Sequence, residues 1–150
     1  MSDNGCGISK DDMELVCERH TTSKISKFED LESVQTFGFR GEALASISHV
    51  SHLSIISCKK GQAVAFNATY EDGKMKTNPK PSSGNLGTTI TVEDLFYNTT
   101  RRKTFGQPSA EYKRILTLVG KYAIKNPTVN FICRNVCSTA FNFVSKKYLI

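Results

Sequence analysis

The sequence predicts an α+β fold in two layers, a mixed but mainly antiparallel sheet with helices on one face. Residues 53–57 and 63–70 are predicted strands joined by a short polar turn with a glycine, which is typical of an antiparallel hairpin. Residues 88–92 are β-branched throughout and predict a further strand. Apolar residues at helical spacing before and after these strands predict the covering layer.

Four segments carry helical signals. Residues 10–19 predict a short helix, because Ser9 is followed three residues later by an acid, as in a capping box. Residues 28–34 predict one or two helical turns, and residues 42–48 a helix that begins at Gly41. A long helix is expected from a cap at Ser109 to the residue before Pro127. Residues 79–87 are expected to form a loop, and residues 129–134 a last strand.

Composition limits the class of protein. The 150 residues suit one domain, and the net charge of +6 favours polyanionic partners, although a solvated basic surface explains it equally well. No apolar run is long enough to cross a bilayer and the start does not resemble a signal peptide, so we expect an intracellular protein without membrane contact. The five cysteines form no CxxC pair, so we expect reduced thiols and no metal site.

The first segment with chemical potential is Asp-Asn-Gly-Cys-Gly-Ile at residues 3–8. Two glycines around one residue let a backbone approach a ligand closely, and the carboxylate of Asp3 can accept a hydrogen bond from an amine. Turns use the same residue types, so the pattern by itself favours a simple turn.

The second segment is Gly-Phe-Arg-Gly-Glu-Ala-Leu at residues 38–44. An arginine between glycines at the start of a helix offers free backbone N–H groups and a positive helix end, which suit phosphate oxygens. The alternative is an ordinary loop-to-helix junction with a surface arginine. No Gly-Lys-Ser or Gly-Lys-Thr follows, so the segment is not a P-loop.

The third segment begins with the threonine-rich strand after Gly87 and continues to a basic run at residues 101–103. Threonines on a buried strand can hydrogen-bond a base or an ordered water, but they are also good strand formers. Arg101, Arg102 and Lys103 are candidate contacts to DNA phosphates, with a solvated loop as the alternative.

Together and in this order, these segments resemble the ATPase domain of the MutL family of DNA mismatch repair proteins. That family belongs to the ATP-binding (GHKL) superfamily of type II topoisomerases, Hsp90 chaperones and histidine kinases. The run Gly-Phe-Arg-Gly-Glu-Ala-Leu-Ala-Ser-Ile at residues 38–47 is the most specific feature and resembles the MutL lid. The segments at residues 16–19, 46–50 and 90–98 are most similar to the eukaryotic MutL homologue 1 branch.

The resemblance implies a role for each matching position. Asp3 would accept the adenine amino group, Gly5 and Gly7 would let the chain pass close to the base, and Thr88 would lie near the adenine. The remaining implied ATP-binding residues border the nucleotide or close over the triphosphate, and they are Thr22, Ser23, Lys24, Arg40, Gly41, Glu42, Ala43 and Leu44.

The resemblance also implies what the chain lacks. It runs from Asp3 to about Arg134, and we expect residues 1–134 to form a partial ATP-binding domain, with a divergent tail at 135–150. In the family, a helix before Asp3 supplies the catalytic glutamate and the asparagine that holds Mg²⁺. We therefore expect an ATPase fold that is incomplete at its N-terminus, no catalytic residue in this chain, and weak or absent turnover.

The family further implies ATP and DNA as partners, a heterodimer with a PMS-type MutL homologue, contact with a MutS-type mismatch sensor, and a nuclear location. The alternative function is a non-catalytic DNA-binding or dimerisation module that has no useful affinity for ATP.

Overall fold

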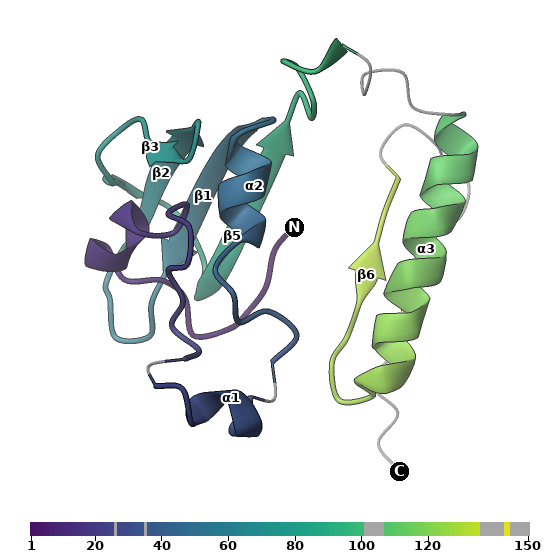
Figure 1. Cartoon of the computed structure of the whole chain (residues 1–150), viewed down its shortest axis with the longest axis horizontal. Coiled ribbons are helices and arrows are strands. Elements are labelled where there is room, and N and C mark those ends of the chain that lie inside the picture. The colour runs from purple at the N-terminus through teal and green to yellow at the C-terminus, as the bar shows by residue number, and fades with distance from the viewer. Residues whose placement is uncertain (26, 35, 101–106, 136–142, 145–150) are drawn as a thin grey trace. The chain divides into compact units, whose positions relative to one another are not determined.

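A computed structural model describes residues 1–25, 27–34, 36–100, 107–135 and 143–144 of the chain. The chain divides into two compact units, Met1–Lys103 and Thr104–Ile150. Unit 1 contains a five-stranded sheet and short helices (Figure 1), and unit 2 contains one long helix and a two-stranded sheet.

The sheet of unit 1 is built from β1 (His52–Cys58), β2 (Ala65–Glu71), β3 (Lys74–Met75), β4 (Lys80–Ser82) and β5 (Gly87–Glu93). The main order is β3-β2-β1-β5, and β4 also pairs with β2. Every pairing among these strands is antiparallel, so the predicted hairpin and the predicted strand at 88–92 are confirmed.

One face of the sheet carries the core. Leu53, Ile55 and Ser57 of β1 and Ala68 and Tyr70 of β2 are buried two residues apart, as the period of two in a strand requires. The core cluster combines these strand residues with the helical segment before them, and consists of Met13, Cys17, Leu53, Ile55, Ala68 and Tyr70. The Tyr70 hydroxyl donates a hydrogen bond to the Met13 carbonyl at 2.8 Å, and burial raises the pKa of the Cys17 thiol to about 11.

Helical segments before β1 pack on that same face, and the predicted fold class is confirmed. The helix α2 (Ala43–Ser48) follows Glu42 as expected and packs on β1, with Leu44 and Ile47 against the core. The helix α1 (Asp30–Ser33) falls within the predicted residues 28–34. In Figure 1, α2 lies over the sheet beside the N-terminal segment.

The helix predicted at residues 10–19 is wrong in extent. Only Asp11–Glu14 forms a regular element, the 3₁₀ helix η1, and the chain continues to His20 in turns closed by i→i+3 hydrogen bonds. The Ser9 hydroxyl does accept a hydrogen bond from the Asp12 amide, as the capping box predicts. Aspartates are weak helix formers, and His20 adopts a left-handed φ of 66°, so a longer α-helix does not form.

The loop predicted at residues 79–87 is partly wrong, because β4 lies within it. Pro81 faces Phe66 in that pairing. Proline has no amide proton to donate, and strands that contain it are restricted to sheet edges or strand ends. The strand β4 pairs only with β2 among the described strands, so this proline is tolerated there.

Unit 2 contains α3 (Pro108–Lys125), β6 (Ile132–Cys133) and β7 (Phe143–Val144). The long helix is confirmed, but it begins at Pro108 after Gln107 rather than with a cap at Ser109, because proline has a helical φ and suits the first turn. The strand expected at 129–134 is limited to β6, which pairs with β7 in the predicted tail. Among the described residues, no helix combines the length and apolarity needed to cross a membrane.

Candidate functional site

Two glycine-rich clusters contain the described candidate residues. The first, called the aspartate cluster below, consists of Asp3, Gly5, Gly7, Ser57, Gly87 and Thr88. The second, called the lid cluster, consists of residues 20–24 and 38–44. Arg101, Arg102 and Lys103 lie outside the described residues.

The aspartate cluster starts with a strand-like pairing of the chain's first residues to β5. Ser2 pairs with Thr89 in antiparallel fashion, Met1 exchanges two backbone hydrogen bonds with Ile90, and the Asp3 amide donates to the Thr88 carbonyl at 2.9 Å. The pairing places Asp3 beside the first residues of β5. The sequence places this residue 85 positions from Thr88, and the fold brings them together.

The Asp3 carboxylate is held through one oxygen. Oδ1 accepts hydrogen bonds from the Gly5 amide at 2.8 Å and from the Thr88 amide at 3.2 Å. Oδ2 has no hydrogen bond to a described residue, and the side chain is exposed. The carboxylate is thus oriented by the backbone and keeps one acceptor oxygen open for a donor from a ligand.

Glycines make this close approach possible. Gly87 has a φ of 113°, and a Cβ added to it would lie 2.2 Å from the Asp3 carbonyl oxygen. Gly7 has a φ of 72°, and an added Cβ would lie 2.2 Å from the Cys58 carbonyl oxygen. Both positions combine a left-handed backbone with contact to another segment's main chain, which only glycine permits. At position 7 the segment that requires glycine is the main chain of Cys58, and the predicted approach of Gly7 to a base stays a prediction.

Ser57 belongs to this cluster, although the sequence analysis did not select it. Its hydroxyl donates to the Gly87 carbonyl at 3.0 Å, accepts from the Ile8 amide at 2.8 Å, and lies 2.9 Å from the Thr88 hydroxyl. Since the one proton of Ser57 goes to Gly87, Thr88 must donate to Ser57. Thr88 can then only accept a hydrogen bond from a ligand. The sequence did carry one signal for Ser57. It follows Leu53 and Ile55 at the strand period of two, so it is a polar residue on the buried face of β1.

The lid cluster joins two segments that the sequence separates by some twenty residues. The His20 amide donates to the Gly41 carbonyl at 3.2 Å. Gly41 has a φ of 63°, and an added Cβ would lie 2.2 Å from the Thr21 carbonyl oxygen. The Thr22 hydroxyl accepts from the Lys24 amide at 3.1 Å, which closes a small turn beside this contact. The structure thus brings Gly41 against His20 and Thr21, which directly precede the predicted residues 22–24.

The charged side chains of the lid cluster point to solvent. Arg40 is exposed, and its guanidinium carbon lies 5.6 Å from the centre of the Phe39 ring. Lys24 is also exposed, and Glu42 lies 4.0 Å from His20. Arg40 forms no ion pair with a described acidic residue. This surface therefore offers two cations and the first N–H groups of α2, which lack partners within the helix, to an anionic ligand.

No hydrogen bond joins the aspartate cluster to the lid cluster among the described residues, but both rest on one core. Ile8, whose amide binds Ser57, packs against the core cluster, and so does Leu44 of α2. Two surface hollows of about 330 Å³ and 580 Å³ lie elsewhere, one beside η1 and one at the edge formed by β2 and β4.

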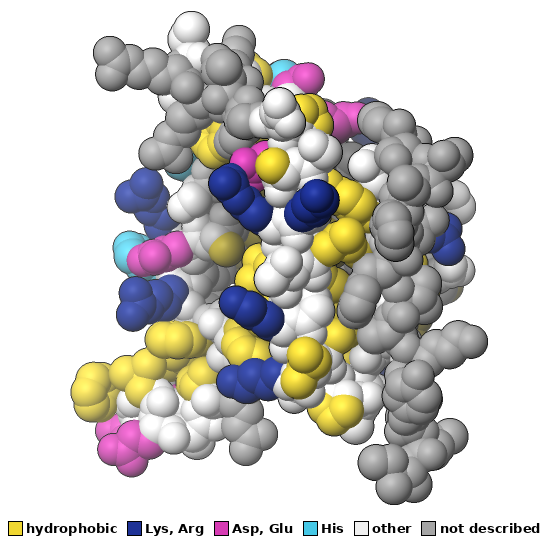
Figure 2. Space-filling view, turned by 90° about the vertical axis from the view of Figure 1, so that its right-hand side faces the viewer, with side chains coloured by type: hydrophobic (Ala, Val, Ile, Leu, Met, Phe, Trp, Pro, Cys, Tyr) yellow, Lys and Arg dark blue, Asp and Glu magenta, His cyan; other side chains and the backbone are white. Residues whose placement is uncertain are grey.

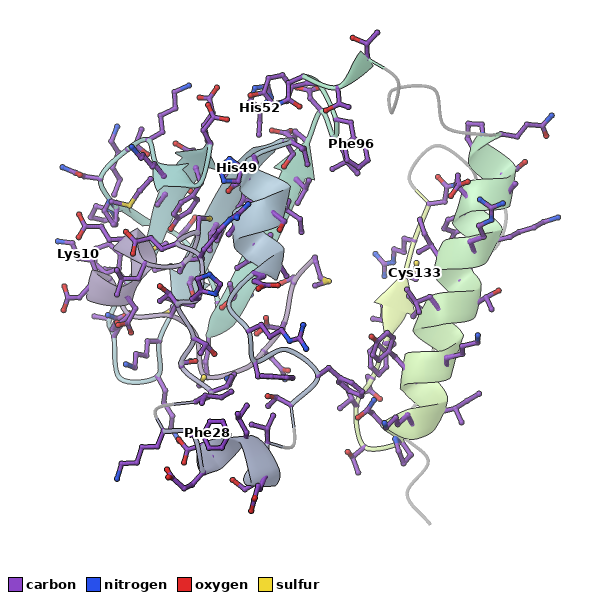
Figure 3. All side chains as sticks on the ribbon, in the orientation of Figure 1. Lys10, Phe28, His49, His52, Phe96 and Cys133 are labelled. Carbon is purple, nitrogen blue, oxygen red and sulfur yellow. The ribbon has the colours of Figure 1, made fainter. Side chains whose placement is uncertain are left out.

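A third group of polar side chains lies where β1 begins and β5 ends. His52 Nδ1 lies 3.1 Å from Asp94 Oδ2, and the His52 ring stacks on Tyr97 at a centroid distance of 4.6 Å. Figure 3 labels His49, His52 and Phe96 in this region. The Phe96 amide donates to the Val50 carbonyl, and Asn98 donates to the His49 carbonyl at 2.8 Å. These contacts hold residues 94–98 against the residues that follow α2. The group therefore has a structural role, and we assign it no part in ligand binding.

Comparisons with known proteins agree with this geometry. The DNA mismatch repair protein Mlh1 of Dictyostelium discoideum is 52% identical over 143 residues, which cover 89% of this chain and 16% of that protein. The DNA mismatch repair protein MLH1 of Saccharomyces cerevisiae is 49% identical over 135 residues, 89% of this chain and 18% of that protein. The MutL protein of Actinobacillus pleuropneumoniae is 47% identical over 130 residues, 86% of this chain and 21% of that protein.

The chain belongs to the MutL family. No model in the scanned set of protein families matches it. The chain spans less than a quarter of the length of the three MutL-family relatives described above.

Solved structures show the same MutL fold. The ATPase domain of Aquifex aeolicus MutL, complexed with ADP, superposes with a TM-score of 0.61 at 30% identity, over 87% of this chain and 45% of that one. The N-terminal domain of a DNA repair protein gives a TM-score of 0.65 at 38% identity, over 87% of this chain and 38% of that one. The predicted fold class is confirmed.

Proposed function

We propose that this chain is the adenine-nucleotide-binding part of a MutL-type mismatch repair protein, with the aspartate cluster at the base and the lid cluster at the phosphates. The observation that carries the proposal is the Asp3 carboxylate, held through Oδ1 by two backbone amides with Oδ2 open. Its support from outside the chain is the 30% identity to a MutL ATPase domain that was solved with ADP.

At the base, Asp3 accepts a hydrogen bond from the exocyclic amine of adenine. The amine is a donor and Oδ2 is an ionised acceptor, so this is a charge-assisted hydrogen bond. Thr88 accepts from the ligand or from an ordered water beside it, because its own proton goes to Ser57. Gly5 keeps the surface next to the carboxylate free of a side chain, so that a flat base can approach, and Gly7 lets this segment lie close to the main chain of Cys58.

At the phosphates, the lid cluster supplies charge and backbone donors. Arg40 and Lys24 face solvent and can pair with phosphate oxygens, and the amides of Gly41, Glu42, Ala43 and Leu44 add N–H donors at the start of α2. Thr22 and Ser23 border the same surface. Magnesium ion would neutralise phosphate charge when bound, and we assign it no ligand among the residues of this chain. We likewise assign no catalytic residue here.

For the complete protein, we propose the cycle of its family. ATP binding orders the lid, the closed state brings two N-terminal domains together, and hydrolysis resets the switch. The proposed partners are a PMS-type MutL homologue, a MutS-type mismatch sensor and DNA, with Arg101, Arg102 and Lys103 among the DNA contacts. The proposed location is the nucleus. Mismatch repair as the process is supported by the relatives, which are DNA mismatch repair proteins.

Replacement of Arg40 by alanine tests the assignment of the lid. We expect affinity for ATP to fall by about tenfold, the usual range for one charge-assisted contact, and affinity for adenosine to stay unchanged, because adenosine has no phosphate. Titration of the labelled chain with each ligand, followed by NMR chemical shifts, measures both. Arg134→Ala, an exposed arginine of unit 2, is the matched control.

An equal fall for adenosine and ATP would contradict the assignment, since Arg40 would then act through folding. If the unchanged chain binds no adenine nucleotide but binds DNA in a salt-sensitive way, the alternative of a DNA-binding or dimerisation module replaces the proposed function.

A further inference from the structure

Asn4 is an asparagine whose surroundings favour a chemical change of its side chain. It precedes Gly5, and the sequence contains no other Asn-Gly pair. Its side chain is exposed and forms no hydrogen bond with any residue that the structure describes. Residues 4–6 lie outside the described helices and strands, on the trace that leaves the N-terminus in Figure 1. The Asn4 side chain is therefore free to turn its carbonyl carbon toward the backbone nitrogen of Gly5.

The backbone nitrogen of Gly5 is both unhindered and polarised. Gly5 is exposed, and glycine has no side chain that would obstruct a reaction at its nitrogen. Asp3 Oδ1 accepts a hydrogen bond from this amide at 2.8 Å. An ionised acceptor draws the proton away from the nitrogen, and the nitrogen must lose that proton in order to act as a nucleophile. Consecutive residues thus supply a proton acceptor, an electrophilic carbon and a nucleophile.

These groups support deamidation of Asn4 through a cyclic imide. The Gly5 nitrogen bonds to the carbonyl carbon of the Asn4 side chain, and the side-chain nitrogen leaves as ammonia with the proton that Gly5 gives up. Water then adds to a carbonyl carbon of the ring, the carbon–nitrogen bond breaks, and the nitrogen takes a proton from that water. Opening at the side-chain carbonyl gives aspartate, and opening at the main-chain carbonyl gives isoaspartate. Nothing is oxidised or reduced.

The chain on either side of Asn4 is tied to a different part of the sheet. Before it, the Asp3 amide donates to the Thr88 carbonyl at 2.9 Å, and after it, the Lys60 amide donates to the Cys6 carbonyl at 3.2 Å. Isoaspartate routes the main chain through the former side chain, which inserts an extra carbon atom between these anchors. The inserted carbon displaces the amide that follows it from the Asp3 carboxylate, because that hydrogen bond closes a short local turn.

We propose that Asn4 is a site of spontaneous deamidation, and that its isoaspartate product frees the Asp3 carboxylate from one of the two amides that hold it. The modification needs water but no enzyme and no bound partner. It leaves the Thr88 amide as the remaining donor to Asp3. A loss of nucleotide affinity follows, and this last consequence rests on the proposed function.

Mass spectrometry of the aged chain tests the modification. The purified chain is kept at physiological temperature and mildly alkaline pH and is then cut after Lys10, which yields a peptide in which Asn4 is the only amide side chain. Deamidation adds the mass difference between an acid and an amide, and chromatography separates the aspartate and isoaspartate forms. A synthetic peptide of residues 1–10 is the unfolded reference.

We expect the folded chain to convert at a rate of the same order as the reference peptide, because the fold leaves Asn4 exposed. Asn85 is the internal control, since it is also exposed and lies between β4 and β5 but precedes Leu86 instead of a glycine. It should remain an amide over the same time. Persistence of Asn4 in the folded chain while the peptide converts, or equal conversion at Asn85, would overturn the proposal.

The modified chain can be isolated by its charge. The net charge is +6, and Figure 2 shows lysine and arginine side chains spread over one face. A cation exchanger therefore retains the chain, and the added carboxylate makes the modified form elute earlier. In that form the Gly5 amide should lose its protection from hydrogen exchange, measured against the equally modified peptide. Full retention of this protection would contradict the release of Asp3.

Affinity for ATP tests the consequence for the proposed function. We expect the isoaspartate form to bind ATP about tenfold more weakly, because one of the two contacts that orient Asp3 is lost. Asn4→Gln should convert much more slowly, since its longer side chain must close a larger ring, and should keep its affinity during ageing. Asn4→Asp carries the new charge without the inserted carbon and should retain more affinity than the isoaspartate form.

Equal losses of affinity in Asn4→Asp and in the isoaspartate form would overturn the release mechanism, because the added charge alone would explain them. If the fresh chain binds no ATP, the proposed function is wrong, whereas the conversion of Asn4 and the hydrogen exchange of Gly5 are measured without any ligand. The two assignments therefore fail separately.

Discussion

Replacement of Gly87 by alanine is expected to detach the chain's first residues from β5 and to destabilise unit 1 by about 1–3 kcal/mol or more. The added Cβ would lie 2.2 Å from the Asp3 carbonyl oxygen and 2.8 Å from the Asn4 Cα, at a φ of 113°. Both contacts are to backbone, so no side-chain rotation relieves them. Urea denaturation measures the loss of stability.

The same replacement should also weaken adenine-nucleotide binding by more than about tenfold. The Asp3 carboxylate loses one of its two donors when the Thr88 amide at 3.2 Å moves away, and only the local Gly5 amide is left to orient it. Gly61→Ala is the matched control, because Gly61 has a φ of 91° but no atom within 4 Å of the added Cβ. If both variants lose the same stability, the cost comes from backbone conformation alone and the close approach of Asp3 is not its cause.

Replacement of Gly41 by alanine is the second large expected effect, and it acts on the lid. The added Cβ would lie 2.2 Å from the Thr21 carbonyl oxygen and 2.7 Å from the Thr21 nitrogen, at a φ of 63°. The residues 20–24 and the start of α2 must then separate, which breaks the hydrogen bond from the His20 amide to Gly41. We expect affinity for ATP to fall by about a hundredfold, because several phosphate donors lose their position together.

Hydrogen exchange at the His20 amide reports the separation directly and should become faster in this variant. Gly38→Ala is the control, since Gly38 belongs to the same segment and an added Cβ meets no atom within 4 Å. An unchanged ATP affinity with accelerated exchange at His20 would show that lid docking does not contribute to nucleotide binding.

The elements that the sequence predicted well are those in which local pattern and tertiary contacts agree. The β-branched run of β5, the hairpin of β1 and β2, and α3 with its proline-limited end are examples. The errors occur where tertiary contacts decide. Burial of Met13 and Cys17 was consistent with a helix, but the intervening backbone closes in 3₁₀ turns. Pro81 indicated a loop, but the segment that contains it pairs with the edge of β2 as the strand β4.

The candidate site was predictable in its residue types but not in its connections. The glycines and charged residues of both clusters carry sequence signals, and the resemblance to the MutL family gave them roles. The hydrogen bonds from the Thr88 amide to Asp3 and from the Ser57 hydroxyl to Gly87 depend on strand register, which no local pattern specifies. Ser57 was therefore missed. The requirement for glycine at position 87 follows from the close approach of the Asp3 main chain, which the sequence does not indicate.

The central claim, that Asp3 reads the amino group of adenine, is tested most directly by comparing ATP with inosine triphosphate in titrations of the chain and of Asp3→Asn. Inosine carries a carbonyl oxygen where adenine carries the amine. The unchanged chain should prefer ATP by about tenfold. Asparagine keeps the acceptor oxygen that binds Gly5 and Thr88 but offers an N–H₂ group to the ligand, so Asp3→Asn should prefer inosine triphosphate. Equal affinity of the unchanged chain for both ligands, or a preference for ATP that survives in Asp3→Asn, would contradict the account.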